Sequence, residues 1–306
     1  MPPEKTALIA DEFLKFKKQN RGPVQIAFYG GNFLGLETGY MLSMLNEARK
    51  LVEKKKVESV RFSTRPDTIT KEKLDMISRF PVSTIEIGVQ SMDNQVLKKA
   101  GRGHTYEETE RAFGLLREPV YSRYKIGAQL MVGLPGDDET KAMASCRRIA
   151  NLSPDFVRIY PTLVIEDSLL AKWYQKGVYC PWPIDRAVTL VKKMYLFFTT
   201  RKIKVIRMGL QASSDLEKGS TVMAGPYHPA FGHMVFSEIF LDRAETILNM
   251  QTGSHAEITI KVHPDSISRM RGLKNRNIRI LKQRHAIKKI HIIPDSDLRS
   301  DACLIR

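Results

Sequence analysis

The chain has 306 residues, of which 42% are hydrophobic and 27% charged, as is ordinary for folded proteins. No apolar run approaches the roughly 20 residues that a membrane-spanning helix needs. The three scattered cysteines (Cys146, Cys180 and Cys303) argue against a disulfide framework and fit a reducing cytoplasm. The net charge of +16 favours a polyanionic partner, nucleic acid first, over the alternative that the charge serves only solubility.

Strand and helix patterns alternate along the first two thirds of the chain. The strand patterns cover residues 24–29, 59–64, 84–89, 125–132, 156–160 and 203–209. The helical patterns cover residues 4–20, 37–56, 70–79, 105–118, 138–151 and 184–201. Thr105 and Glu108 have the spacing of a capping box at the start of one helix. This alternation predicts βαβ units and one parallel sheet whose strands are apolar on both faces.

The composition changes after residue 212, which predicts three parts. Residues 1–212 form the alternating α/β domain, and residues 213–253 form a linker rich in Ser, Gly and Pro with a helix at 231–248. Residues 254–306 form a small basic βαβ domain, with strands at 257–262 and 289–293 around a helix at 275–285.

Glycines and polar residues gather where the predicted strands end. Gly30 and Gly31 follow the first strand, Ser63 and Arg65 end the second, and Gln90 ends the third. Carboxyl ends of parallel strands meet at one edge of a sheet, so these residues predict a pocket for a polar ligand. Taken singly, each has a plain alternative, a tight turn for the glycine pair and a solvated loop for the others.

Six segments in this order resemble the radical S-adenosylmethionine (SAM) proteins, in the group of the Elongator catalytic subunit. They are residues 28–33, 61–67, 86–91, 101–105, 131–136 and 157–163. The resemblance implies a partial (β/α)6 TIM-like barrel without its first strand, and it implies SAM as a cofactor. It implies that the paired glycines contact the methionine end of SAM, that polar strand ends hold the ribose, and that residue 134 lies near the adenine. The implied cofactor-binding residues are Gly30, Gly31, Asn32, Ser63, Arg65, Glu86, Gln90, Gln129, Leu134 and Tyr160.

The chain departs from this family at the iron–sulfur cluster. The family holds a [4Fe–4S] cluster on the three thiolates of a Cys-x-x-x-Cys-x-x-Cys motif, and no two cysteines of this chain are close in sequence. We therefore expect no metal ligands here. Either the chain is an N-terminally truncated form or it is a degenerate relative, and truncation is favoured because a lost barrel strand leaves an open parallel edge.

The expected family activity is reductive cleavage of SAM to a 5′-deoxyadenosyl radical that acts on a substrate. The resemblance and the charge indicate RNA, such as a tRNA base, as that substrate. Two alternatives stay open: a non-catalytic relative that binds RNA or a partner protein on the same scaffold, and an enzyme like the coproporphyrinogen oxidases that share the barrel.

The basic segment near the C-terminus is a candidate nucleic-acid-binding element. Gly272 begins a loop that faintly resembles the Gly-x-x-Gly loop of KH RNA-binding modules, although Asn275 stands in place of the second glycine. The predicted contacts to RNA phosphates are Arg271, Lys274, Arg276 and Arg279. The alternative is a solvated basic face on a small docking domain.

Overall fold

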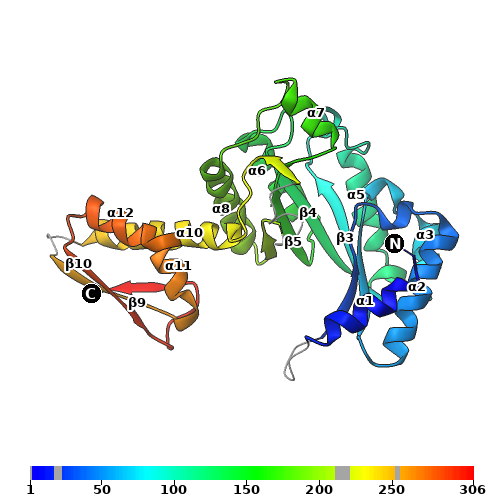
Figure 1. Ribbon diagram of the computed structural model, residues 1–306, viewed down its shortest axis with the longest axis horizontal. Coiled ribbons are helices and arrows are strands. Elements are labelled where there is room, and N and C mark those ends of the chain that lie inside the picture. The colour runs from blue at the N-terminus through cyan, green and yellow to red at the C-terminus, as the bar shows by residue number, and fades with distance from the viewer. Residues whose placement is uncertain (1, 17–22, 211–220, 252–255) are drawn as a thin grey trace. The chain divides into compact units, whose positions relative to one another are not determined.

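The computed structural model describes residues 2–16, 23–210, 221–251 and 256–306, which form two compact units (Figure 1). The first unit runs to Ile159 and includes Phe198–Ile206, and the second comprises Tyr160–Phe197 and Arg207–Arg306. Part of the predicted linker, residues 213–220, lies outside the described residues. A search of the described helices finds none that is both long and apolar enough to cross a membrane.

A curled sheet of six strands forms the frame of the first unit, in the order β1-β2-β3-β4-β5-β7. The strands are β1 (Gln25–Phe28), β2 (Ser59–Thr64), β3 (Val82–Gln90), β4 (Lys125–Val132), β5 (Phe156–Pro161) and β7 (Lys204–Met208). The pairings of β1 with β2, β2 with β3 and β3 with β4 are parallel. The predicted partial barrel is confirmed.

Helices connect successive strands, as the alternating pattern predicts, and one further helix precedes β1. They are α1 (Lys5–Leu14), α2 (Thr38–Glu53), α3 (Lys71–Ile77), α4 (Asn94–Lys99), α5 (Tyr106–Leu116), α6 (Glu139–Asn151), α7 (Leu169–Gln175) and α8 (Ile184–Thr200). Figure 1 shows α2, α3 and α5 together on one side of the sheet. The capping box of α5 is confirmed, because Thr105 accepts from the backbone N–H of Glu108 and the Glu108 carboxylate accepts from the N–H of Thr105.

The two faces of the sheet differ in polarity. Along β3, Ile85, Ile87 and Val89 are fully buried on the face toward the helices, whereas Glu86 lies on the opposite face with Arg61 of β2. The prediction that these strands are apolar on both faces is therefore wrong. The inner, concave face carries polar and charged side chains, because it is a lumen rather than a second helix-packing surface.

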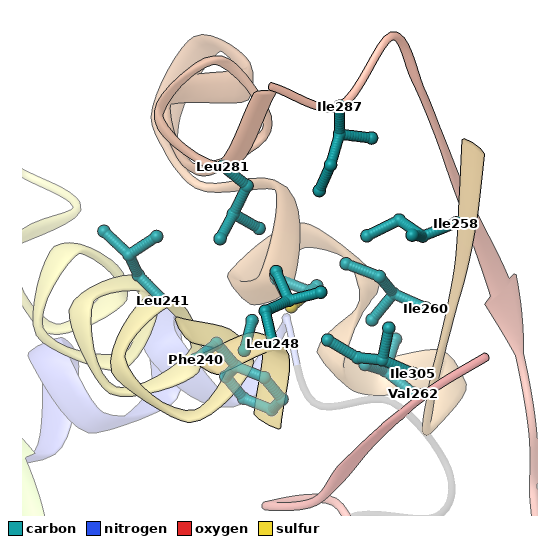
Figure 2. Packing of buried hydrophobic residues seen from close by; sticks show 11 residues of the cluster. Phe240, Leu241, Leu248, Ile258, Ile260, Val262, Leu281, Ile287 and Ile305 are labelled. Carbon is teal, nitrogen blue, oxygen red and sulfur yellow. The ribbon is translucent and has the colours of Figure 1, made fainter. Parts of the chain in front are cut away.

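The C-terminal module, residues 256–306, has its own core (Figure 2). Its elements are β9 (Glu257–Val262), α11 (Ile267–Arg271), α12 (Arg276–Arg284), β10 (Lys289–Pro294) and β11 (Cys303–Ile305). Strand β9 lies centrally, parallel to β10 and antiparallel to β11. The core joins Ile258 and Ile260 of β9 to Leu281 of α12 and to Phe240 of the long helix α10 (Phe231–Met250). The predicted βαβ unit thus contains a second helix, α11, and a third strand.

Candidate functional site

A buried ion-pair cluster occupies the lumen of the half-barrel. The fully buried Glu86 accepts hydrogen bonds from Tyr29 Oη at 2.6 Å, from Gln129 Nε2 at 2.8 Å and from Arg61 Nε at 3.0 Å. Arg158 Nε forms an ion pair with Glu86 Oε2 at 2.9 Å. A carboxylate so completely buried is stable only with partners of this kind, so the cluster fixes four strands to one another around a single acid.

The cluster changes the chemistry of its members. Burial raises the pKa of Tyr29, and its hydrogen bond to the Glu86 carboxylate raises the pKa further, so the phenol stays a donor. Two guanidinium groups face one carboxylate, which leaves these side chains with a net positive charge. Beneath them, Gln25 donates to Ser59 and Ser83, both at 2.9 Å, and accepts from Arg61 at 3.3 Å. The lumen is therefore a continuous polar network.

The glycine pair after β1 leaves open space at the edge of the sheet. Gly30 and Gly31 have φ values of +145° and +113°, and no atom lies within 4 Å of where a Cβ would stand on either residue. They line a cavity of about 260 Å³ together with Tyr29, Asn32 and Ser63. A backbone this accessible can approach a ligand closely.

Asn32 and Arg65 hold the loops that follow β1 and β2. The Asn32 side-chain oxygen accepts from Thr64 and Thr68, both at 2.8 Å, and from the backbone N–H of Arg65 at 3.2 Å. Arg65 forms a bidentate pair with Asp67 and donates to the carbonyl of Gly103 at 2.6 Å. That hydrogen bond to Asp67 raises the pKa of Arg65. Both side chains therefore shape the edge of the sheet.

The end of β3 carries an unsatisfied polar atom. Gln90 adopts a left-handed conformation with φ +64°, and its Oε1 atom is buried without a hydrogen-bond partner among the described residues. A left-handed non-glycine residue and an orphaned acceptor are both costly, and both concentrate at ligand sites.

A partly buried cation, Arg102, follows helix α4. No carboxylate in the described part of the chain pairs with Arg102, whose Nη2 lies 2.8 Å from Met131 Sδ, and burial lowers its pKa. Burial also lowers the pKa of His104, which contacts the carbonyl of Val89 at 3.2 Å. A partly buried guanidinium without a carboxylate partner among the described residues favours a site that takes an anionic group.

The remaining predicted residues fall in two places. Leu134 is buried just after β4, beside a turn in which Asp137 accepts from the N–H of Gly133 at 2.9 Å. Tyr160 ends β5 and belongs to the second compact unit. The structure thus brings Glu86 and Gln129 into contact, and it places Gly30, Gly31, Asn32 and Ser63 around one cavity.

Sequence reasoning did not assign Tyr29, Arg61 or Arg102 to the site, and it placed Arg158 among the polar strand ends without giving it a role. A usable signal exists for two of them. Arg61 and Arg158 each interrupt an otherwise apolar strand at alternate spacing, which indicates an inward-facing charge that needs a buried partner.

The cysteines do not fit an iron–sulfur cluster. Cys146 is buried in α6, Cys180 is exposed and Cys303 is partly buried in β11. No group of His, Cys, Asp or Glu side chains in the described ranges is arranged to hold a metal ion. The described side chains therefore do not fit a [4Fe–4S] cluster. The cavity at Gly30 and Gly31 and the unpartnered Gln90 oxygen do fit a polar ligand such as SAM.

Comparison with known proteins places the chain in a family. The sequence model of the radical SAM superfamily matches residues 2–149, and that of the radical SAM C-terminal domain matches residues 154–240. The tRNA uridine(34) acetyltransferase of Methanocaldococcus jannaschii is 32% identical over 158 residues, which is 50% of this chain and 29% of that protein. Elongator complex protein 3 of Saccharomyces cerevisiae is 29% identical over 143 residues, or 45% of this chain and 25% of that protein.

Two further comparisons bear on the fold and the alternatives. The oxygen-independent coproporphyrinogen-III oxidase-like protein HemZ of Bacillus subtilis is 30% identical over 146 residues, or 47% of this chain and 29% of that protein. The chain spans less than a third of the length of these three relatives. The archaeal Elp3 of Methanocaldococcus infernus with an N-terminal deletion superposes with a TM-score of 0.63 at 23% identity, covering 78% of this chain and 58% of that structure. The chain belongs to the radical SAM superfamily, and Elongator protein 3 is among its relatives.

Proposed function

We propose that the first unit binds SAM at the carboxyl ends of its strands and that the protein serves in the modification of tRNA. The orphaned Gln90 oxygen beside a strand-end loop is the observation that carries the binding site, because a buried acceptor without a donor needs a ligand hydroxyl or amine. Similarity to a protein named tRNA uridine(34) acetyltransferase and the charge of +16 support tRNA as the substrate class.

The proposed contacts follow the chemistry of SAM. The open backbone at Gly30 and Gly31 suits the methionine end, and Ser63 and Gln90 offer hydrogen bonds to a ribose. Arg102 has the charge to pair with an anionic group of the cofactor or substrate. The Glu86 cluster lies in the lumen, where we assign it the task of holding these strand ends in place.

When bound, a [4Fe–4S] cluster supplies the electron that cleaves SAM, but the described residues hold no ligand set for it. We therefore expect this chain, treated with iron and sulfide without oxygen, to gain no stoichiometric cluster and to form no 5′-deoxyadenosine.

The binding site is tested by titration calorimetry with SAM and S-adenosylhomocysteine. Gln90→Ala should weaken binding about 5-fold or more, because one buried hydrogen bond contributes about 1 kcal/mol. Gln95→Ala, on an exposed position of α4, is the matched control and should bind like the wild type. Equal affinities for the wild type and Gln90→Ala would contradict the assigned contact.

The other two functions remain distinguishable. A porphyrin-oxidising relative should bind coproporphyrinogen and not tRNA. The similarity to a coproporphyrinogen-oxidase-like protein supports this reading, and the basic charge weighs against it. A purely RNA-binding relative should bind tRNA and neither SAM nor S-adenosylhomocysteine.

A further inference from the structure

The C-terminal module carries a stretch of one-sided charge. Residues 266–294 contain nine Lys and Arg and no Asp or Glu, namely Arg269, Arg271, Lys274, Arg276, Arg279, Lys282, Arg284, Lys288 and Lys289. Three of these pair with acids from outside the stretch: Arg276 with Glu238, Arg284 with Glu245 at 2.6 Å, and Lys289 with Glu257 at 3.3 Å. These three glutamates neutralise only three of the nine positive charges, so most of the charge of the stretch stays uncompensated.

Five of the other cations are exposed and form no ion pair with any described residue, and one of them, Lys288, lies beyond the end of α12. The remaining four are Arg271, Lys274, Arg279 and Lys282, and we call them the basic surface. Arg271 ends α11, Lys274 lies in the connecting loop, and Arg279 and Lys282 lie on α12. Arg279 and Lys282 are three positions apart, so they share one face of the helix. This concentration of uncompensated charge fits a polyanion.

The fold fixes the loop that carries Lys274. Lys274 and Asn275 both adopt left-handed conformations, with φ values of 50° and 58°. The buried Asn277 donates to the carbonyl of Ser237 at 2.8 Å, and a Cβ on Gly272 would stand 2.8 Å from its Oδ1 atom. Glycine is therefore required at position 272, and the loop is anchored to α10 rather than free to collapse.

The inward face of α12 is already occupied. Leu281 packs in the core of the module (Figure 2), and Asn277 is also fully buried. This leaves the helix no apolar face to insert into a lipid surface. The exposed positions of α12 are all polar or charged, namely Arg276, Arg279, Lys282, Gln283 and Arg284. A hydrated polyanion is thus favoured over a membrane.

We propose that the basic surface binds the phosphate backbone of an RNA strand, so that the C-terminal module anchors the RNA. This inference rests on the proposed function for one point, the identification of the polyanion as RNA. Arg276, also predicted from the sequence to contact phosphate, donates to Glu238, so its charge is shared and we assign Lys282 in its place. Phosphate contacts of this kind position a strand without reading its sequence.

The test compares two triple variants of the full chain. Arg271→Gln/Lys274→Gln/Arg279→Gln removes three charges from the basic surface. Lys54→Gln/Arg79→Gln/Lys125→Gln removes three exposed charges near the amino ends of β2, β3 and β4. The affinity for a labelled, unmodified tRNA transcript is measured by fluorescence anisotropy over a range of salt concentrations. Circular dichroism and thermal melting check that both variants fold.

The basic-surface variant should bind the tRNA about 10-fold or more weakly at ~0.1 M salt, and the slope of log K against log salt should fall by about 2 to 3. The control variant should lose much less. Should the basic-surface variant unfold, Lys274→Gln alone, at an exposed position, should still lower the slope by about 1.

Three results would overturn the inference: equal losses in both triple variants, no binding of tRNA by the wild type even at low salt, or binding to anionic lipid vesicles that depends on the basic surface while tRNA binding does not. A SAM titration of the wild type separates this inference from the proposed function. A wild type that binds tRNA through the basic surface but does not bind SAM would contradict the proposed SAM site and leave this inference standing.

Discussion

Replacing Glu86 by alanine should destabilise the first unit strongly. The substitution removes the one acid that Arg61, Arg158, Tyr29 and Gln129 share. The side chains of Arg61 and Arg158 are only 17% and 15% exposed, so water cannot replace the carboxylate well. Breaking a buried pair from one side costs about 3–5 kcal/mol.

Urea unfolding followed by circular dichroism measures this loss. Glu86→Gln keeps the shape and one acceptor oxygen, so it should cost less than Glu86→Ala. Glu53→Ala is the control, because Glu53 is 67% exposed and lies 3.7 Å from Arg49 in a surface pair, so stability should change little. If Glu86→Ala unfolds at the same urea concentration as the wild type, or as Glu53→Ala, the cluster does not hold the barrel together and the reasoning is wrong.

Two further predictions concern single side chains of the first unit. Thr105→Ala removes the cap of α5 and should cost about 1 kcal/mol of stability in the same urea assay, whereas Thr105→Ser should restore most of it; equal losses for both would contradict the capping role. Burial raises the pKa of Asp137 to about 6, so its protonated form is favoured in the folded state. The stability that this group contributes is present below its unfolded pKa of about 3.8 and is lost as the pH rises through about 6. Thermal melting should show this pH-dependent loss in the wild type and not in Asp137→Asn, and identical pH profiles would refute the assignment.

The periodicity of the chain predicted most of the first unit, for a physical reason. Buried residues at alternate positions and helical stripes are local patterns, so β2 and β4 fall at the predicted residues and α5 begins at its predicted cap. The short elements α4, α7 and α11 were missed because five to seven residues do not establish a helical period.

The polar lumen could not be predicted from composition. Whether a strand has one apolar face or two depends on which strands curl around a common space, and that is a tertiary property. The glycine pair and Gln90 were identified by their place at strand ends, which local patterns do indicate. The pairing of Glu86 with Arg61, Arg158 and Tyr29 was missed, because the sequence does not say which inward-facing side chains meet.

The most direct test of the central claim is a crystal structure of this chain with S-adenosylhomocysteine, grown without iron. Our account predicts the ligand at the carboxyl ends of the strands, against the backbone of Gly30 and Gly31, with a hydroxyl or amine hydrogen-bonded to Gln90 Oε1. A ligand bound elsewhere, or one bound at that edge with Gln90 Oε1 still unpartnered, would contradict it.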